Sequence, residues 1–322
     1  MVTNKQIKHN NMKKTLIALA ALARVAACNK AEVIETTQDN LIGFKAPFVD
    51  NATKALNNDY SGTKELTGFK VYGTVKGNLD PVNIFKDVQI NRNNKDFNVA
   101  WDYANASDAE YWVPGCTYNF AAIVDGTVPA DGYTTTGMPA KINYTIGDGD
   151  LLYATATAST VDNTNPGLVA FTFDHLLSKV YFTVDDKFTS GDYTYTMTNI
   201  MVDGIPSNGV YTVGTTVANG TWAAGSGVVA ENAALDFGTF ATPNAHLIIP
   251  VKQTMNIKFS YNIVYKGTPI STIEVDENLE YTFAKKTVYN VKVTLPALGN
   301  KIEFTVTAKP GDFTSGGSVS VQ

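Results

Sequence analysis

Few residues of this sequence stand in patterns that could do chemistry. Asp174 and His175 could form an acid–base pair, but neighbours on a strand point to opposite faces, and no G-x-S-x-G motif supplies a nucleophile. We therefore predict that His175 is a core or corner residue. The run Asp148-Gly149-Asp150 lacks the further acidic positions of a Ca²⁺ loop and is expected to be a turn. With three histidines and two cysteines in the chain, a zinc site is not expected. We predict a protein that is not an enzyme and needs no cofactor or metal.

Cys28 is the residue with the clearest expected chemistry. Two lysines, Lys13 and Lys14, precede an apolar run that is too short to span a membrane, and Val25-Ala26-Ala27 leads into Cys28. This pattern predicts an export signal over residues 1–28 and resembles a bacterial lipobox, in which the cysteine thiol takes a diacylglycerol before cleavage. Arg24 is unusual so near the cut, so an ordinary signal peptide with an incidental cysteine is the alternative. A lipid on Cys28 would hold the protein at the outer membrane or cell surface.

Composition and charge limit the class of the exported chain. Charged residues make up 17%, Gly is frequent, and Thr and Tyr recur in alternating runs, which indicates an all-β protein. The net charge of -5 and the absence of a basic cluster argue against a nucleic-acid partner. If Cys28 carries lipid, Cys116 has no cysteine left to pair with. We expect Cys116 to be a buried core residue, with a reactive thiol or an intermolecular bridge as alternatives.

Turn residues divide the chain into two strand-rich halves. Residues 29–40 are polar and acidic, as in a flexible spacer. Residues 162–167 bring six turn-forming residues together, including Pro166 and Gly167, and we place a domain boundary there. The prediction is an N-terminal β-sandwich over 41–166 and a C-terminal β-sandwich over 167–322. The clearest hairpin joins strands 255–266 and 268–275 around Gly267, and a terminal pair is expected over 301–308 and 318–322.

Ordered landmarks along the chain resemble those of the Bacteroidetes fimbrillin family. No single landmark is specific, but their order covers nearly the whole exported chain. They are Ile42-Gly43-Phe44, Phe69-Lys70-Val71-Tyr72-Gly73, Trp101-Asp102-Tyr103, Tyr111-Trp112, Asp150-Leu151-Leu152-Tyr153-Ala154, the run from Phe173 to Val180, and Leu247-Ile248-Ile249-Pro250. The resemblance implies a type V pilus subunit with two transthyretin-like (Greek-key) β-sandwich domains in tandem. It also implies export as a lipoprotein and polymerisation by exchange of a β-strand between subunits.

The resemblance assigns roles to both ends of the chain. Residues 41–49 would block a groove until a protease cuts the loop behind them. The family's usual arginine at the cut is replaced by Lys54, and the only arginine after Cys28 is Arg92, so a lysine-accepting protease fits better. An ordinary surface lysine is the alternative for Lys54. The family's usual C-terminal tryptophan is replaced by Asp312-Phe313. The residues that could form a donated strand are Ile302, Phe304, Val306, Val319 and Val321.

Other functions remain open at this point. An adhesin at the tip or anchor of a fimbria, binding a host or glycan ligand, is the main alternative, and a hydrolase on a β-sandwich is a third. Trp101 and Trp112 could form a glycan platform, but we expect them in the sandwich core. The expected partners are other fimbrial subunits, the membrane through the lipid, and the processing protease.

Overall fold

The computed structural model describes residues 40–49, 66–92, 101–147, 149–162, 164–186, 192–216, 219–239, 241, 243–295 and 302–310. These residues contain no α-helix, only the short 3-10 helices η2 (Ala106–Asp108) and η4 (Glu231–Ala233). The strands are β1 Phe48–Val49, β2 Gly68–Lys76, β3 Val82–Asn91, β4 Asp102–Tyr103, β5 Thr117–Val124, β6 Lys141–Thr145, β7 Leu152–Ser159, β8 Thr172–His175, β9 Ser178–Asp186, β10 Tyr193–Met197, β11 Met201–Asp203, β12 Asn208–Thr212, β13 Thr221–Ala224, β14 Leu235–Asp236, β15 Ala245–Ile248, β16 Lys252–Tyr265, β17 Thr268–Thr282, β18 Thr287–Leu295 and β19 Glu303–Pro310. The all-β prediction is confirmed.

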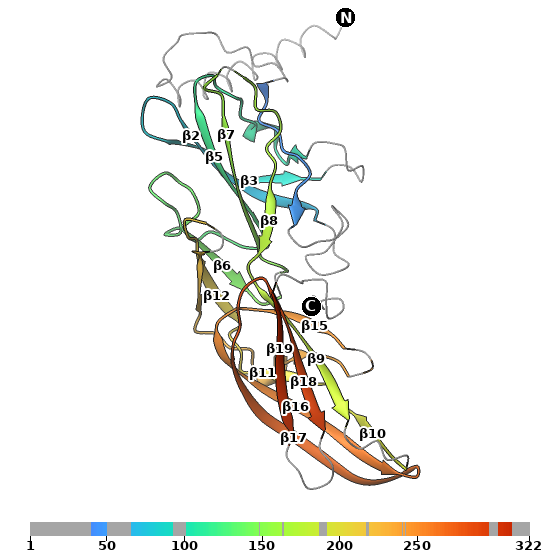
Figure 1. Ribbon diagram of the computed structural model, residues 1–322. Helices are drawn as coiled ribbons and strands as arrows, with labels where there is room; N and C mark the ends of the chain where they lie inside the picture. The colour runs from blue at the N-terminus through green and yellow to red at the C-terminus, as the bar shows by residue number, and fades with distance from the viewer. Residues whose placement is uncertain are drawn as a thin grey trace, which may run out of the picture.

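A seven-stranded sheet forms the upper part of the molecule in Figure 1, in the order β1-β8-β7-β5-β2-β3-β4. Its central strand β5 is buried on both faces: Tyr118 and Phe120 join one apolar cluster, whereas Ala121 and Ile123 join another. Double burial explains why this strand is a nearly continuous apolar run instead of an alternating one. The first cluster is rich in aromatic rings and includes Ile42 and Phe44 from the first described residues.

Two sheets form the lower part and enclose a second apolar cluster. One sheet has the order β10-β16-β11-β14, with β17 also paired to β16, and the other has the order β15-β9-β18-β19. Along β16, Ile257, Phe259, Tyr261 and Ile263 are buried at alternate positions, as one face of a half-buried strand requires. The predicted β16–β17 hairpin is confirmed. Lys266 and Gly267 both have positive φ, 46° and 81°, as a tight two-residue hairpin turn requires.

Strands from the two predicted halves pair with each other on either side of residue 166. β8 follows the predicted boundary but pairs with β7 in the first sheet, and β6 precedes the boundary but pairs with β12 in a three-stranded sheet, β13-β12-β6. The chain therefore leaves the first sheet only after His175 at the end of β8. Independent folding of 41–166 and 167–322, as two transthyretin-like sandwiches in tandem, stays a prediction.

The last strand of the described chain, β19, covers most of the first strand of the expected terminal pair. β19 lies antiparallel to β18, from Thr287 opposite Pro310 to Thr294 opposite Glu303. Residues 318–322, the predicted partner, lie outside the described residues. Within the described part of the chain, no helix has the length and apolarity that a membrane crossing needs.

Candidate functional site

The segment formed by residues 40–49, here called the first segment, lies between two backbone edges of the upper part, and the space it occupies between them is here called the groove. The sequence predicts a regular strand over 41–49, but only Phe48 and Val49 form one, β1, which runs parallel to β8. The rest is held by isolated bridges. Leu41 pairs with Tyr111, and Phe44 pairs with Trp101 on one side and with Val169 on the other.

Backbone hydrogen bonds hold the first segment from both sides. On one side, the Val169 N–H donates to the Gly43 carbonyl at 2.8 Å, and the Lys45 N–H donates to the Val169 carbonyl at 2.8 Å. On the other side, the Trp112 N–H donates to the Asn40 carbonyl at 2.8 Å, and the Trp101 N–H donates to the Phe44 carbonyl at 3.2 Å. The first segment is thus held between two backbone edges, each hydrogen-bonded to it.

Phe44 anchors the first segment in the aromatic cluster. Its side chain is fully buried, and four rings surround it at centroid distances of 5.9–6.1 Å. These four rings, here called the Phe44 cage, belong to Phe69, Phe85, Tyr103 and Phe171. A ring of this size in well-packed surroundings contributes both apolar burial and ring–ring contacts. The cage therefore encloses a fully buried ring of the first segment.

A phenol fixes the position of the backbone beside the cage. The Tyr103 hydroxyl donates to the Ile42 carbonyl at 2.6 Å. Burial is the main cause that raises the pKa of Tyr103 above its usual value, so the phenol stays protonated and remains a donor at neutral pH. Tyr103 thus contacts the first segment through both its ring and its hydroxyl.

The predicted site residues fall into two groups. Cys28, Lys54, Val319 and Val321 lie outside the described residues, so lipidation, cleavage and the second donor pair stay predictions. Ile302, Phe304 and Val306 lie together: they share one face at the start of β19 and pack, half-buried, against the lower cluster. Their donor role stays a prediction as well, since β18 of the same chain is the strand partner that the structure gives them.

Cys116 is fully buried in the aromatic cluster, so its predicted core position is confirmed. Its sulfur is disulfide-bonded in this structure, which corrects the expectation of an unpaired thiol. The sequence holds only one other cysteine, Cys28. A cysteine cannot carry a lipid thioether and a disulfide at once, so a lipid on Cys28 would exclude a disulfide bond between Cys28 and Cys116.

The other candidate residues are core residues. Trp101 and Trp112 are 4% and 3% exposed, which confirms the core prediction and leaves no glycan platform at these positions. His175 is also buried, and its Nδ1 lies 2.5 Å from the Asp150 Oδ2, while Asp174 pairs with Lys286. Burial raises the pKa of Asp150, and the nearby His175 opposes that rise. The described residues hold no group of three or more His, Cys, Asp or Glu that could bind a metal.

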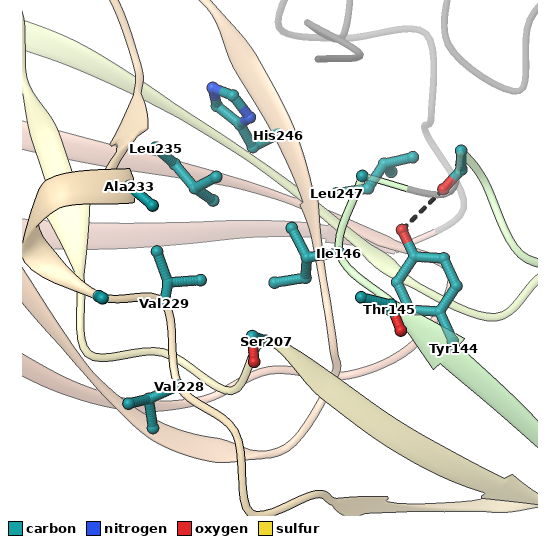
Figure 2. Close-up of a pocket in the computed structure, with 13 residues that line it drawn as sticks. Tyr144, Thr145, Ile146, Ser207, Val228, Val229, Ala233, Leu235, His246 and Leu247 are labelled. Atoms are coloured by element: carbon teal, nitrogen blue, oxygen red, sulfur yellow. Dashed lines mark hydrogen bonds between the residues drawn. The ribbon is translucent and has the colours of Figure 1, made fainter.

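A pocket of about 530 Å³ opens where the upper and lower parts meet (Figure 2). Its wall is mostly aliphatic, from Ile146, Val229, Leu235 and Leu247, with Ser207 and His246 as polar neighbours. The Tyr144 hydroxyl donates to the Gly149 carbonyl at 2.7 Å and closes one side. His246 donates from Nε2 to the Asp236 carbonyl, and burial lowers its pKa, so it is neutral. The pocket could hold a small apolar group.

Sequence reasoning missed the groove walls and the pocket. The apolar residues Val169, Phe171 and Phe173 suit a strand, but nothing local indicates that this stretch pairs with residues more than a hundred positions earlier. The pocket residues come from separate short stretches, each of which reads as an ordinary turn or strand end. No sequence signal could have joined them.

Comparisons with known proteins agree with this fold. The fimbrillin-like family model matches residues 53–310. A fimbrial protein from Bacteroides vulgatus is 15% identical with a TM-score of 0.58, over 84% of this chain and 99% of that chain. A putative cell adhesion protein from Bacteroides uniformis is 15% identical with a TM-score of 0.52, over 86% of this chain and 100% of that one. At such identities the structures show a shared fold alone.

Among curated proteins, the comparison gave no significant match. The family match nevertheless spans most of the sequence, from residue 53 to Pro310 at the end of β19. It confirms the resemblance to the fimbrillin family that the order of the landmarks indicated. The chain therefore belongs to the fimbrillin-like family.

Proposed function

We propose that this protein is a structural subunit of a cell-surface fimbria, a type V pilus, which polymerises by strand exchange after proteolysis removes the first segment. The observation that carries the proposal is the groove around residues 40–49. Both of its edges donate and accept backbone hydrogen bonds, and its floor is the Phe44 cage. Removal of the first segment would leave unpaired backbone groups and an apolar cavity, which a strand from another subunit would cover.

The proposal includes the processing steps. A lipid on Cys28 would carry the protein to the outer membrane, and a protease that accepts Lys54 would cut within the loop behind the first segment. A strand from the C-terminal part of a second subunit would then enter the groove. Such a contact would persist because exchange restores a backbone ladder and buries apolar side chains together.

Cleavage of the purified protein after Lys54 tests the proposal. We expect monomer to convert into multimers that survive mild detergent and dissociate on boiling, seen as a heat-labile ladder on a gel. Lys54→Gln should remain monomeric under the same protease, and a chain without residues 301–322 should be cut but not polymerise. Cleaved, full-length protein that stays monomeric at high concentration would contradict strand exchange.

A second candidate function is that of a fimbrial tip or anchor adhesin, and the pocket of Figure 2 is what favours it. At about 530 Å³ it has the size of small-ligand sites. Its aliphatic wall suits an apolar host ligand better than a glycan, which commonly stacks on an exposed aromatic ring. An adhesin would bind its ligand as a cleaved monomer, and Val228→Arg, at a pocket-lining position that is 61% exposed, should abolish that binding without changing the gel ladder.

A further inference from the structure

Two segments of the chain carry the same side-chain spacing. Ile42-Gly43-Phe44 lies in the groove, and Ile302-Glu303-Phe304 leads into β19. Each continues on the same face with a smaller apolar residue, Ala46 in the first segment and Val306 in β19. One segment is the occupant of the groove, and the other lies at an edge of the lower part (Figure 1).

We propose that residues 302–306 of a second copy replace residues 42–46 in the groove in the same register, with Phe304 in the Phe44 cage. The inference rests on the strand exchange proposed above and selects the donor among the candidates. Isoleucine replaces isoleucine and phenylalanine replaces phenylalanine, so the volume of the two deepest positions is conserved. Val306 adds two methyl groups at the position of Ala46, which is only partly buried.

The alternative donor pair fits the cage less well. Val319 and Val321 have the same alternation, but a valine in place of Phe44 would leave most of a ring's volume empty between four aromatic side chains. An unfilled cavity in a packed core costs free energy in proportion to its size. The cage therefore favours a donor with an aromatic ring at the second apolar position.

The position between the two anchors needs one adjustment. Gly43 is buried under Leu168, and a Cβ built on it would lie 2.5 Å from the Leu168 Cδ2. Glu303 would take this place, so Leu168 must turn away. Its side chain is 41% exposed and only its terminal methyl is in the way, so this movement is feasible, and the glutamate carboxylate would then reach solvent. Leu168 thus decides how well the groove accepts a residue larger than glycine.

The donor is also the more easily released of the two segments. Among the described strands β19 pairs only with β18, and its apolar side chains Phe304 and Val306 are only partly buried. Transfer breaks that ladder and forms one with the two walls of the groove. Phe304 would pass from a half-buried site to a fully buried one, so the exchange increases its apolar burial.

Peptide competition tests the inference apart from the proposed function. Protein cut after Lys54 is allowed to polymerise with a synthetic peptide of residues 301–310, its Phe304→Ala version, or a peptide of residues 313–322. We expect the first peptide to cap the groove and shorten the ladder, and the Phe304→Ala peptide to act at least tenfold more weakly. If the 313–322 peptide competes as well or better, the assignment to β19 is wrong while strand exchange stands. If the cut protein forms no multimers without peptide, strand exchange itself fails.

Two variants sharpen the test. Leu168→Ala should bind the 301–310 peptide several times more tightly than the unchanged groove does, and that advantage should vanish for the peptide with Glu303→Gly. A photo-crosslinking phenylalanine analogue at position 304 should give crosslinks between subunits to the Phe44 cage after cleavage. The same analogue at position 313 should not. Crosslinks from position 304 that stay within one chain after polymerisation would overturn the proposal.

Discussion

The first segment and β19 differ in how the rest of the molecule holds them. The first segment has little regular strand, yet it is bonded along both sides and its central ring is fully enclosed. β19 is a regular eight-residue strand, yet it has one strand partner among the described residues and no fully buried side chain. A segment can therefore be held firmly in the fold without forming a regular strand. The proposal accordingly assigns removal by proteolysis to the first segment and donation to β19.

Phe44→Ala should have the largest effect on stability. Loss of a fully buried ring from the cage should lower the free energy of unfolding by about 3–5 kcal/mol, through lost burial and a residual cavity. Chemical denaturation followed by tryptophan fluorescence measures it, because Trp101 contacts Phe69 of the same cage. Phe48→Ala, at a position 55% exposed, is the matched control and should change little. Equal effects of the two variants would show that the cage does not hold the segment.

The buried Asp150–His175 pair, at the end of β8, should give the next largest effect on stability. Asp150→Ala should cost about 1–3 kcal/mol, since it leaves a buried imidazole nitrogen unpaired. The pKa of Asp150 is raised in the folded protein, so its favourable contribution is present below the unfolded pKa of about 4 and is lost as the pH rises through the folded value. The variant should therefore be destabilised more at pH 4 than at pH 7.

A denaturation series over pH checks this expectation. Glu280→Gln serves as the control, because Glu280 and its partner Lys252 are 62% and 67% exposed and such pairs contribute little. A larger loss at pH 7 than at pH 4 would contradict the sign.

Phe304→Ala should have a smaller effect than Phe44→Ala, although the side chain removed is the same. Because Phe304 is only partly buried at an edge, we expect a loss of about 1–2 kcal/mol in the uncut monomer. After cleavage the order of effects should reverse for assembly, since Phe44 has left and Phe304 has taken its place. Thermal denaturation of the monomer and the gel ladder of cut protein give the two readouts. A Phe304→Ala loss as large as that of Phe44→Ala would remove the distinction between the regions.

Tyr103→Phe should have the smallest effect, about 1 kcal/mol, because only the hydrogen bond to the Ile42 carbonyl is lost while the ring stays. The same loss should appear in the polymer if a donated strand places a carbonyl at that point. Tyr265→Phe, on a tyrosine that is 36% exposed, is the control. Differential denaturation of monomer and multimer measures both, and an unchanged polymer would mean that Tyr103 does not contact the donated strand.

The sequence predicted what depends on local pattern. Alternation along 257–263 and the glycine at 267 predicted the hairpin, and Trp101, Trp112 and His175, which were expected in the core or, for His175, at a corner, are buried. It could not predict which distant segments pair. Phe44 pairs with Val169 and Trp101 although many other apolar stretches of the sequence could pair with it. Tertiary packing determines which of them does. For the same reason the sequence did not show that β8, which follows the turn at 162–167, pairs with β7 of the first sheet.

Hydrogen exchange at the groove walls tests the central claim most directly. In the intact protein the amides of Trp101, Trp112 and Val169 donate to the first segment and should exchange slowly. Once the chain is cut after Lys54 and the first segment is removed under conditions that prevent assembly, these three amides should exchange rapidly. In the assembled multimer they should be protected again, although residues 40–49 are gone. If they stay protected in the cut monomer, or stay exposed in the multimer, the groove is not where one subunit receives the strand of the next.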